Sequence, residues 1–217
     1  PCDPQLKNTV HLLGFRESDL CLPWREGKVH ILKMLEGQIV TEDVQEEVGY
    51  TEEKGRKVFK PDGTYQKIAA VERHKNTGKI GVGIVKGFGL RGGAIASSVS
   101  HDSHNLIVIG DNDHDMYLAV QELLRTQGGY TLVENGQVFD TLPLPIMGLM
   151  SDAGYEKVNE KLARMIPKAH EMGIPEGFDP FITLSFMALP VIPEIRITPR
   201  GVYLTQEDRM IQSPFDR

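Results

Sequence analysis

Residues 105–126 read NLIVIGDNDHDMYLAVQELLRT and carry the clearest structural signal in the chain. The run from Leu106 to Ile109 is continuously apolar, which is typical of a central strand that is covered on both faces. Apolar residues then recur at the spacing of one helical face, at Met116, Ala119, Val120, Leu123 and Leu124. The stretch therefore predicts a buried strand, a turn, and a helix over 113–126 that ends before Gly128-Gly129.

Two β-hairpins are predicted on either side of this unit. Residues 67–73 and 79–86 are apolar runs rich in β-forming residues, and the segment between them suits a turn. Residues 130–134 and 137–142 flank Asn135-Gly136, the pair best able to adopt the two positive φ angles of a type I′ turn. Nearer the centre of the chain, the small side chains of the stretch from Arg91 to Val99 predict a further buried strand.

Shorter patterns predict the outer elements. Residues 28–35 alternate like a strand, and Thr41 is expected to N-cap a short acidic helix through Val48. Near the other end of the chain, residues 181–189 and 194–198 are predicted strands.

A second long helix is predicted after Ser151 or Asp152, either of which suits the N-cap position. Pro167 should kink or shorten this helix, because proline removes a hydrogen-bond donor and clashes with the preceding turn. Together the patterns predict an α+β fold, with a mixed sheet, two long helices and several β-hairpins. Pro61-Asp62-Gly63 predicts a tight turn, and we place a domain boundary near residue 60.

The composition excludes some classes of protein. The 217 residues include 24 Lys and Arg against 30 Asp and Glu, a formal charge of −6, which argues against a dedicated nucleic-acid binder. No apolar stretch approaches the roughly 20 residues of a membrane helix, so no membrane partner is expected. Cys2 and Cys21 are the only cysteines and are interpreted as incidental thiols of a reducing, cytoplasmic compartment. The start at Pro1, without a signal sequence, suggests a piece of a longer chain.

Titratable side chains are densest on both sides of the apolar 106–109 strand. Residues 100–105 read SHDSHN and precede it, whereas residues 111–115 read DNDHD and follow it. A straight strand of six residues spans about 20 Å. The two clusters should therefore lie at opposite ends of the strand and not form one site.

The first cluster, residues 100–105, has two interpretations. His101 and His104, with Asp102 fixing a tautomer, could act on a substrate proton or bind a metal, because imidazoles titrate near neutrality. Alternatively, the segment is a polar loop whose side chains bond nearby backbone groups. The spacing alone favours the loop, since His-x-x-His outside a helix is not a diagnostic metal-binding pattern.

The second cluster is interpreted mainly as a helix start, because carboxylates there are stabilised by unpaired amides. A ligand site at the end of the strand is the alternative.

Gly87 to Gly92 read GFGLRG and formally match the dinucleotide-binding pattern Gly-x-Gly-x-x-Gly. That pattern requires a helix after the glycines, whereas here a strand-like run follows, so nucleotide binding is rejected. The glycines are expected to form a close-packed turn that presents Arg91 to a ligand or a carboxylate.

Several longer motifs resemble the C-terminal domain of bacterial and archaeal adenine deaminases. These motifs are VERH at 71–74, GIVKGFGLRGGAIASSVSHDSHN at 83–105, LPLPI at 142–146, GLMS at 148–151, DPFITLSF at 179–186 and ALPVIPE at 188–194. The resemblance also takes in GQIVT at 37–41 and covers nearly the whole chain. It implies that residues 61–217 form this domain, and that residues 1–60 are a linker and the return strands of a flanking small β domain.

The resemblance implies a hydrolase of purine salvage that converts adenine and water to hypoxanthine and ammonia. The family belongs to the amidohydrolase superfamily, whose two divalent metals, usually manganese or iron, are held by a barrel domain that begins with His-x-His. This sequence has no His-x-His and is too short for a (β/α)₈ barrel beside its other elements. The chain is therefore expected to shape or cover the active site of an absent N-terminal barrel, to bind no metal itself, and to be inactive alone.

Under this interpretation the polar loop faces the barrel and adenine. We predict His101, Asp102 and His104 as catalytic residues, and Ser100, Ser103, Asn105 and Arg91 as substrate-binding residues, with no metal ligand. A homo-oligomer is expected. The alternative is a non-catalytic module that stabilises the barrel or the oligomer.

Overall fold

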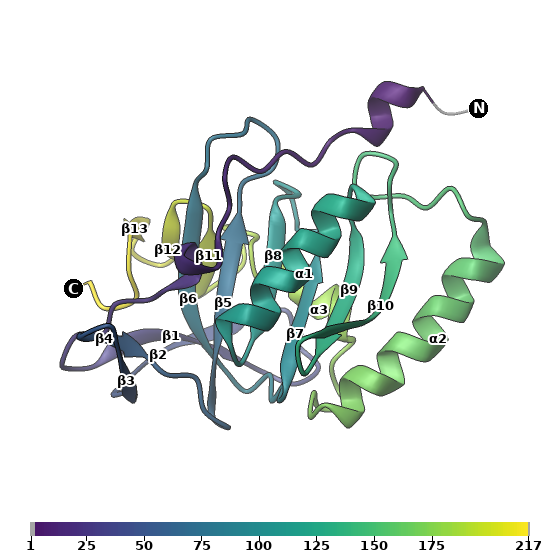
Figure 1. The fold of residues 1–217 in the computed structure, drawn as a ribbon. Helices are drawn as coiled ribbons and strands as arrows, with labels where there is room; N and C mark the ends of the chain where they lie inside the picture. The colour runs from purple at the N-terminus through teal and green to yellow at the C-terminus, as the bar shows by residue number, and fades with distance from the viewer. Residues whose placement is uncertain (1–2, 217) are drawn as a thin grey trace.

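A mixed sheet of eight strands runs through the computed structural model, which describes residues 3–216 (Figure 1). Its strand order is β10 (Gln137–Pro143), β9 (Gly129–Glu134), β7 (Gly93–Ser97), β8 (Leu106–Gly110), β5 (Tyr65–Val71), β6 (Ile80–Lys86), β1 (Val29–Met34) and β2 (Thr41–Glu46). The β1–β6 pair is parallel and the other neighbours are antiparallel. The predicted α+β class is confirmed.

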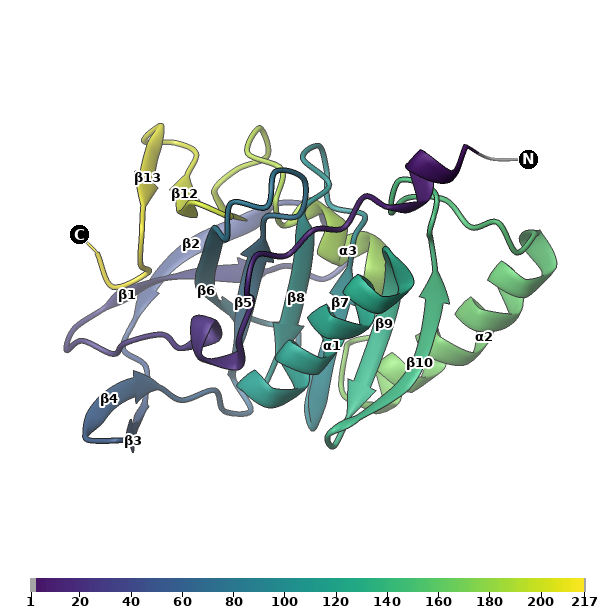
Figure 2. The same cartoon turned by 45° about the horizontal axis from the view of Figure 1, so that its top comes forward.

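Both faces of the sheet are covered (Figure 2). Helix α1 (Asp113–Thr126) packs on one face, beside a short hairpin of β3 (Tyr50–Glu53) and β4 (Arg56–Phe59). The other face carries α2 (Tyr155–Glu171), α3 (Pro180–Phe186) and a three-stranded sheet of β11 (Ile195–Thr198), β12 (Gly201–Leu204) and β13 (Arg209–Ile211). Two 3₁₀ turns, η1 (Pro4–Lys7) and η2 (Glu17–Leu20), lie in the N-terminal segment.

The alternation of side chains along the central strands explains the two covered faces. In β8, Ile107 and Ile109 face the core under α2 and α3, whereas Leu106 and Val108 face the core under α1. All five β8 residues are buried, so the continuous apolar run does form a central strand. Helix α1 has the predicted bounds, and the Asn112 side chain caps it by accepting from the Asp115 N–H.

Two predicted elements are wrong. Residues 41–46 form strand β2 and not a helix, because their side chains pair across to β1: Lys33 with Glu42 at 2.6 Å, and His30 with Asp43 at 2.9 Å. The stretch predicted as a strand over 181–189 contains helix α3, because Asp179 caps the Phe181 and Ile182 N–H groups and Pro180 suits the first turn.

The second long helix also begins later than predicted. Gly154, and neither Ser151 nor Asp152, is the N-cap of α2. The helix continues past Pro167 to Glu171, so it is not shortened. Pro167 and Ala163 are exposed, so the Ala163 carbonyl that loses its donor can bond water.

The sheet crosses the predicted boundary near residue 60. Strands β1 and β2 come from before this position, yet β1 pairs with β6 from after it. At its outer side, β2 exchanges backbone bonds between Thr41 and the segment Pro193-Glu194. The division into two domains remains a prediction.

Two smaller expectations concern the thiols and the membrane. Cys21 is exposed and free, and Cys2 lies outside the described residues. Within residues 3–216, no helix combines the length and the apolar character needed to cross a membrane.

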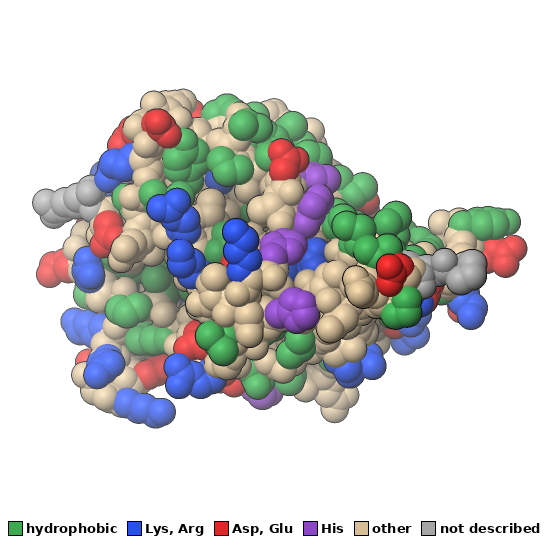
Figure 3. All heavy atoms as spheres, turned by 90° about the horizontal axis from the view of Figure 1, so that it is seen from above, with side chains coloured by type: hydrophobic (Ala, Val, Ile, Leu, Met, Phe, Trp, Pro, Cys, Tyr) green, Lys and Arg blue, Asp and Glu red, His purple; other side chains and the backbone are tan. Residues whose placement is uncertain are grey.

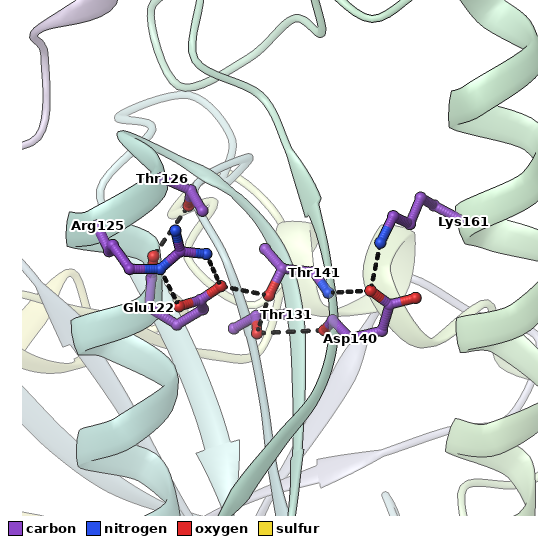
Figure 4. A network of polar contacts seen from close by, with 7 residues as sticks. All are labelled: Glu122, Arg125, Thr126, Thr131, Asp140, Thr141 and Lys161. Atoms are coloured by element: carbon purple, nitrogen blue, oxygen red, sulfur yellow. Dashed lines mark hydrogen bonds and ion pairs between the residues drawn. The ribbon is translucent and has the colours of Figure 1, made fainter.

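A polar network connects both long helices to the edge strand β10 (Figure 4). The Thr141 hydroxyl donates to Glu122 of α1 at 2.9 Å and lies 2.9 Å from the Thr131 hydroxyl. The neighbouring Asp140 accepts from Lys161 of α2 at 2.5 Å. Glu122 also accepts two bonds from Arg125, and these bonds lower the pKa of its carboxyl despite partial burial. Adjacent residues of β10 thus hold a helix on each face of the sheet.

Replacing Thr141 with Val should destabilise the protein by about 1–2 kcal/mol. The valine keeps the shape of the side chain but removes two hydrogen bonds in a buried position. Urea unfolding of the wild type, Thr141→Val and the exposed-site control Thr64→Val would measure the difference. Equal losses in both variants would show that the network does not stabilise the fold.

Candidate functional site

The candidate site is the connection from β7 to β8 at residues 100–105, called here the histidine loop. It lies at the end of the sheet that also carries the β5–β6 turn, and the N-terminal segment passes over this end (Figure 2). Figure 3 looks down on this end and shows histidine side chains gathered near its middle. The loop is the place where the sequence predicted catalytic residues.

Backbone bonds hold the histidine loop at both ends. The His101 N–H donates to the Ser185 carbonyl of α3 at 2.9 Å, and the His104 N–H donates to the Ser100 carbonyl at 2.5 Å. His104 adopts a positive φ of 49°, which closes the loop tightly. From the β5–β6 turn, Nε2 of His74 donates to the Ser103 carbonyl at 2.7 Å. The loop is therefore a fixed structure.

Arg73 supports the loop through hydrogen bonds from its guanidinium and its backbone. Its Nε donates to the His104 carbonyl at 2.5 Å, and its backbone N–H donates to the side-chain oxygen of Asn105 at 3.3 Å. Arg73 is only 1% exposed, and burial lowers its pKa to about 10. Its position at the end of β5 makes it part of the floor of the site.

The imidazole rings of His101 and His104 lie edge to face, with their centres 5.7 Å apart. His101 also packs on Phe186 of α3, with ring centres 5.0 Å apart. Burial, and next the electrostatic effects of His101 and Arg73, lower the pKa of His104 below its ordinary value of 6.5. A neutral His104 can both donate and accept hydrogen bonds at neutral pH.

Two buried polar atoms of the loop have no hydrogen-bond partner among the described residues. They are Oγ of Ser100, whose residue is fully buried, and Nδ1 of His104. Buried polar groups are rarely left unpaired, because desolvation without a partner is costly. The carboxylate of Asp102 is exposed, whereas these two atoms are enclosed by the protein, so a ligand reaches them only when the loop rearranges.

The structure brings six of the seven predicted site residues together in the histidine loop. Asn105 differs from the others, because its side-chain oxygen accepts from the backbone N–H of Arg73. Arg91 lies apart: it precedes β7, whose five residues span about 17 Å, whereas the loop follows β7. The exposed Arg91 is anchored by its backbone N–H to the Met172 carbonyl at 2.8 Å and does not share the site.

The glycine pattern before β7 behaves as predicted. It forms turns at positive φ, and a strand follows it in place of the helix that dinucleotide binding requires. Gly89 approaches the backbone closely, since a Cβ on it would lie 2.5 Å from the Gly173 carbonyl oxygen.

The second acidic cluster lies at the opposite end of β8 and is structural. Asp111 accepts from the Gly92 and Gly93 N–H groups, and Asp115 accepts from the Gly136 N–H. Asp113 pairs with Lys67, and burial raises the pKa of the Asp113 carboxyl despite that cation. Each carboxylate thus fixes a turn or a helix end.

Arg73, His74 and Phe186 belong to the site but were not predicted as site residues. Arg73 and His74 stand in the VERH motif at 71–74, and the charged Arg73 at the end of an apolar run was the available signal. The place of Phe186 beside His101 depends on α3, which the sequence did not predict.

The donor set of the histidine loop does not fit a metal centre. Across residues 3–216, no group of three or more His, Cys, Asp or Glu side chains is arranged to hold a metal ion.

The chain is an α+β domain that carries a histidine loop. Comparison of its sequence with known families shows which domain family this is. Residues 38–209 match the family model described as the adenine deaminase C-terminal domain, and the chain belongs to this family. The matched range begins before β2 and continues across residue 60.

Curated relatives support this assignment. The chain is 50% identical over 212 residues to an adenine deaminase of Desulfitobacterium hafniense (strain Y51), and 44% identical over 202 residues to one of Nitratidesulfovibrio vulgaris (strain DP4). A Bacillus subtilis (strain 168) adenine deaminase is 43% identical over 205 residues. These matches cover 98%, 93% and 93% of this chain, but only 37%, 35% and 35% of the relatives' lengths. The chain thus spans about a third of these relatives.

The turn that carries His74 should depend on pH through Glu72. The Glu72 carboxylate accepts from the His74, Lys75 and Thr77 N–H groups and from the Thr77 hydroxyl. Burial opposes the charge, but these bonds outweigh it and lower the Glu72 pKa from 4.5 to about 2. Because the folded pKa is depressed, the stabilisation is complete above pH 4.5 and is lost as the pH falls toward 2.

Glu72→Gln should remove this pH-dependent part of the stability. The difference in unfolding free energy between wild type and Glu72→Gln should be largest at neutral pH and should shrink at pH 3, between the two pKa values. Urea titrations at both pH values would test this, with the exposed Glu47→Gln as control. A difference that stays constant with pH would contradict the assignment.

Proposed function

We propose that this chain is the C-terminal part of an adenine deaminase, which converts adenine and water to hypoxanthine and ammonia. The family assignment and the names of the relatives support the reaction. About two thirds of each relative lies outside the match, which leaves room for a catalytic barrel. In this proposal the enzyme acts in purine salvage in the cytoplasm as a homo-oligomer.

The histidine loop is the observation that carries the proposed role of this chain. It is held rigidly from below, and it combines two imidazoles with the unpaired Oγ of Ser100 and Nδ1 of His104. Adenine offers a donor and acceptors along its edge, which suit neutral imidazole and hydroxyl groups. We place this loop over the mouth of the barrel, where His101 or His104 bonds the purine edge or moves a proton, and Asp102 orients them.

The metals belong to the proposed barrel and not to this chain. Two divalent ions there, manganese or iron, would supply Lewis-acid activation of a water molecule. The residues of the histidine loop would bind the purine, hold it in place and exclude bulk water.

His101→Ala and His104→Ala in the full-length protein should test the proposed role. Loss of a proton-transferring imidazole typically lowers kcat by about 100-fold or more, whereas loss of a binding contact raises KM. His114→Ala is the matched control, because that exposed histidine lies at the opposite end of β8. Unchanged kcat and KM in both loop variants would remove the role.

The alternative function is an assembly module without a chemical role. It is favoured by three exposed apolar side chains: Leu13 is 60% exposed, Met147 43% and Met150 51%. Met147 adjoins the site, since its carbonyl accepts from Arg73. Silent His101 and His104 variants, with no binding of adenine by the isolated chain in calorimetry, would support assembly.

A further inference from the structure

Two arginines are buried in this protein without a carboxylate partner. Arg73 is 1% exposed and Arg196 is fully buried, and neither forms an ion pair within residues 3–216. Both instead donate to carbonyl and hydroxyl oxygens. A buried charge without an opposite charge is unfavourable. Each guanidinium therefore depends on the oxygen atoms that accept its hydrogen bonds.

The bonds of Arg196 are all local to the junction of β2 and β11. It donates to the Thr41 hydroxyl and to the carbonyls of Ile39, Pro193 and Ile195. This junction is remote from the histidine loop in the sheet order, so Arg196 has a structural role.

The bonds of Arg73 instead join the segments that frame the histidine loop. Its guanidinium donates to the His104 carbonyl, to the carbonyl and hydroxyl of Thr9, and to the Met147 carbonyl. These acceptors belong to the loop itself, the N-terminal segment and the segment after β10. One planar group therefore fixes three separate chain segments relative to each other.

The guanidinium is closely packed against the backbone of Gly148. Gly148, at φ +72°, lies against it so closely that a Cβ would come within 2.8 Å of both terminal nitrogens. The Gly148 carbonyl is itself fixed by the hydroxyl of the buried Ser98 at 2.5 Å. Lysine, with one point charge in place of a planar fork, cannot reproduce these bonds.

We propose that Arg73 is a positioning residue of the active site, which sets where the His101 and His104 rings lie. The guanidinium contacts the loop through its bond to the His104 carbonyl, so a shift of the guanidinium moves the His104 ring and, through the edge-to-face contact, His101. The catalytic consequence rests on the proposed function, whereas the placement of the rings does not.

The charge of Arg73 acts in the same direction. The groups that face His104 are His101 and Asp102 in the loop, Arg73 at the end of β5, and His74 in the β5–β6 turn. Burial, His101, Arg73 and His74 favour the neutral imidazole, and only Asp102 opposes them. Arg73 thus both places His104 and helps to keep it uncharged.

The test compares Arg73→Lys with Arg196→Lys in the full-length protein. Both variants keep the charge and break bonds to buried oxygens, so both should lose stability. Only Arg73→Lys should lower kcat, by about 10- to 100-fold with a smaller change in KM, and should change the pH profile of kcat. Thr9→Val is a milder variant that removes one acceptor of the guanidinium, and it should move kcat in the same direction.

Ring signals give a readout that does not depend on activity. In protein labelled with ¹³C-histidine, the His101 and His104 signals should shift in Arg73→Lys and Thr9→Val but not in Arg196→Lys. If these signals and kcat stay at wild-type values in Arg73→Lys, or in Thr9→Val where Arg73→Lys does not fold, the proposal is overturned. Shifted signals with silent His101→Ala and His104→Ala variants would instead refute the proposed function and retain the positioning.

Discussion

The constraint on which the site depends is the burial of the Arg73 guanidinium among carbonyl oxygens. A buried cation without a carboxylate is costly unless nearby oxygen atoms accept hydrogen bonds from it. Thr9, His104 and Met147 supply the acceptors, and Gly148 leaves the space that the guanidinium fills. The histidine loop is ordered because it completes this cage.

The central elements could be predicted from the sequence because their signals are local. The buried strand β8, helix α1 and the Asn135-Gly136 hairpin follow from apolar spacing and turn chemistry within a few residues. The errors arose where one signal outweighed another. Residues 41–46 form a strand because they pair with the neighbouring strand β1, and the local helix start at Asp179-Pro180 precedes a run of mainly apolar residues that resembles a strand.

The candidate site was predictable in part for the same reason. The histidines of residues 100–105 stand next to each other in sequence, so their density was visible. The support from Arg73 was not, because its acceptors lie 31, 64 and 74 residues away. Arg91 was grouped with the loop because the two are close in sequence. The extended strand β7 lies between them and places them at opposite ends of the sheet.

The pairing at the outer edge of β2 affects folding of the protein during its synthesis. The Thr41 hydroxyl bonds the Ile195 carbonyl, 154 residues further along the chain, and Glu194 bonds the Thr41 carbonyl. During synthesis, this edge of the sheet stays unpaired until the ribosome has made residues 193–195. Since unpaired strand edges favour aggregation, β2 is a vulnerable part of the nascent chain until that pairing forms.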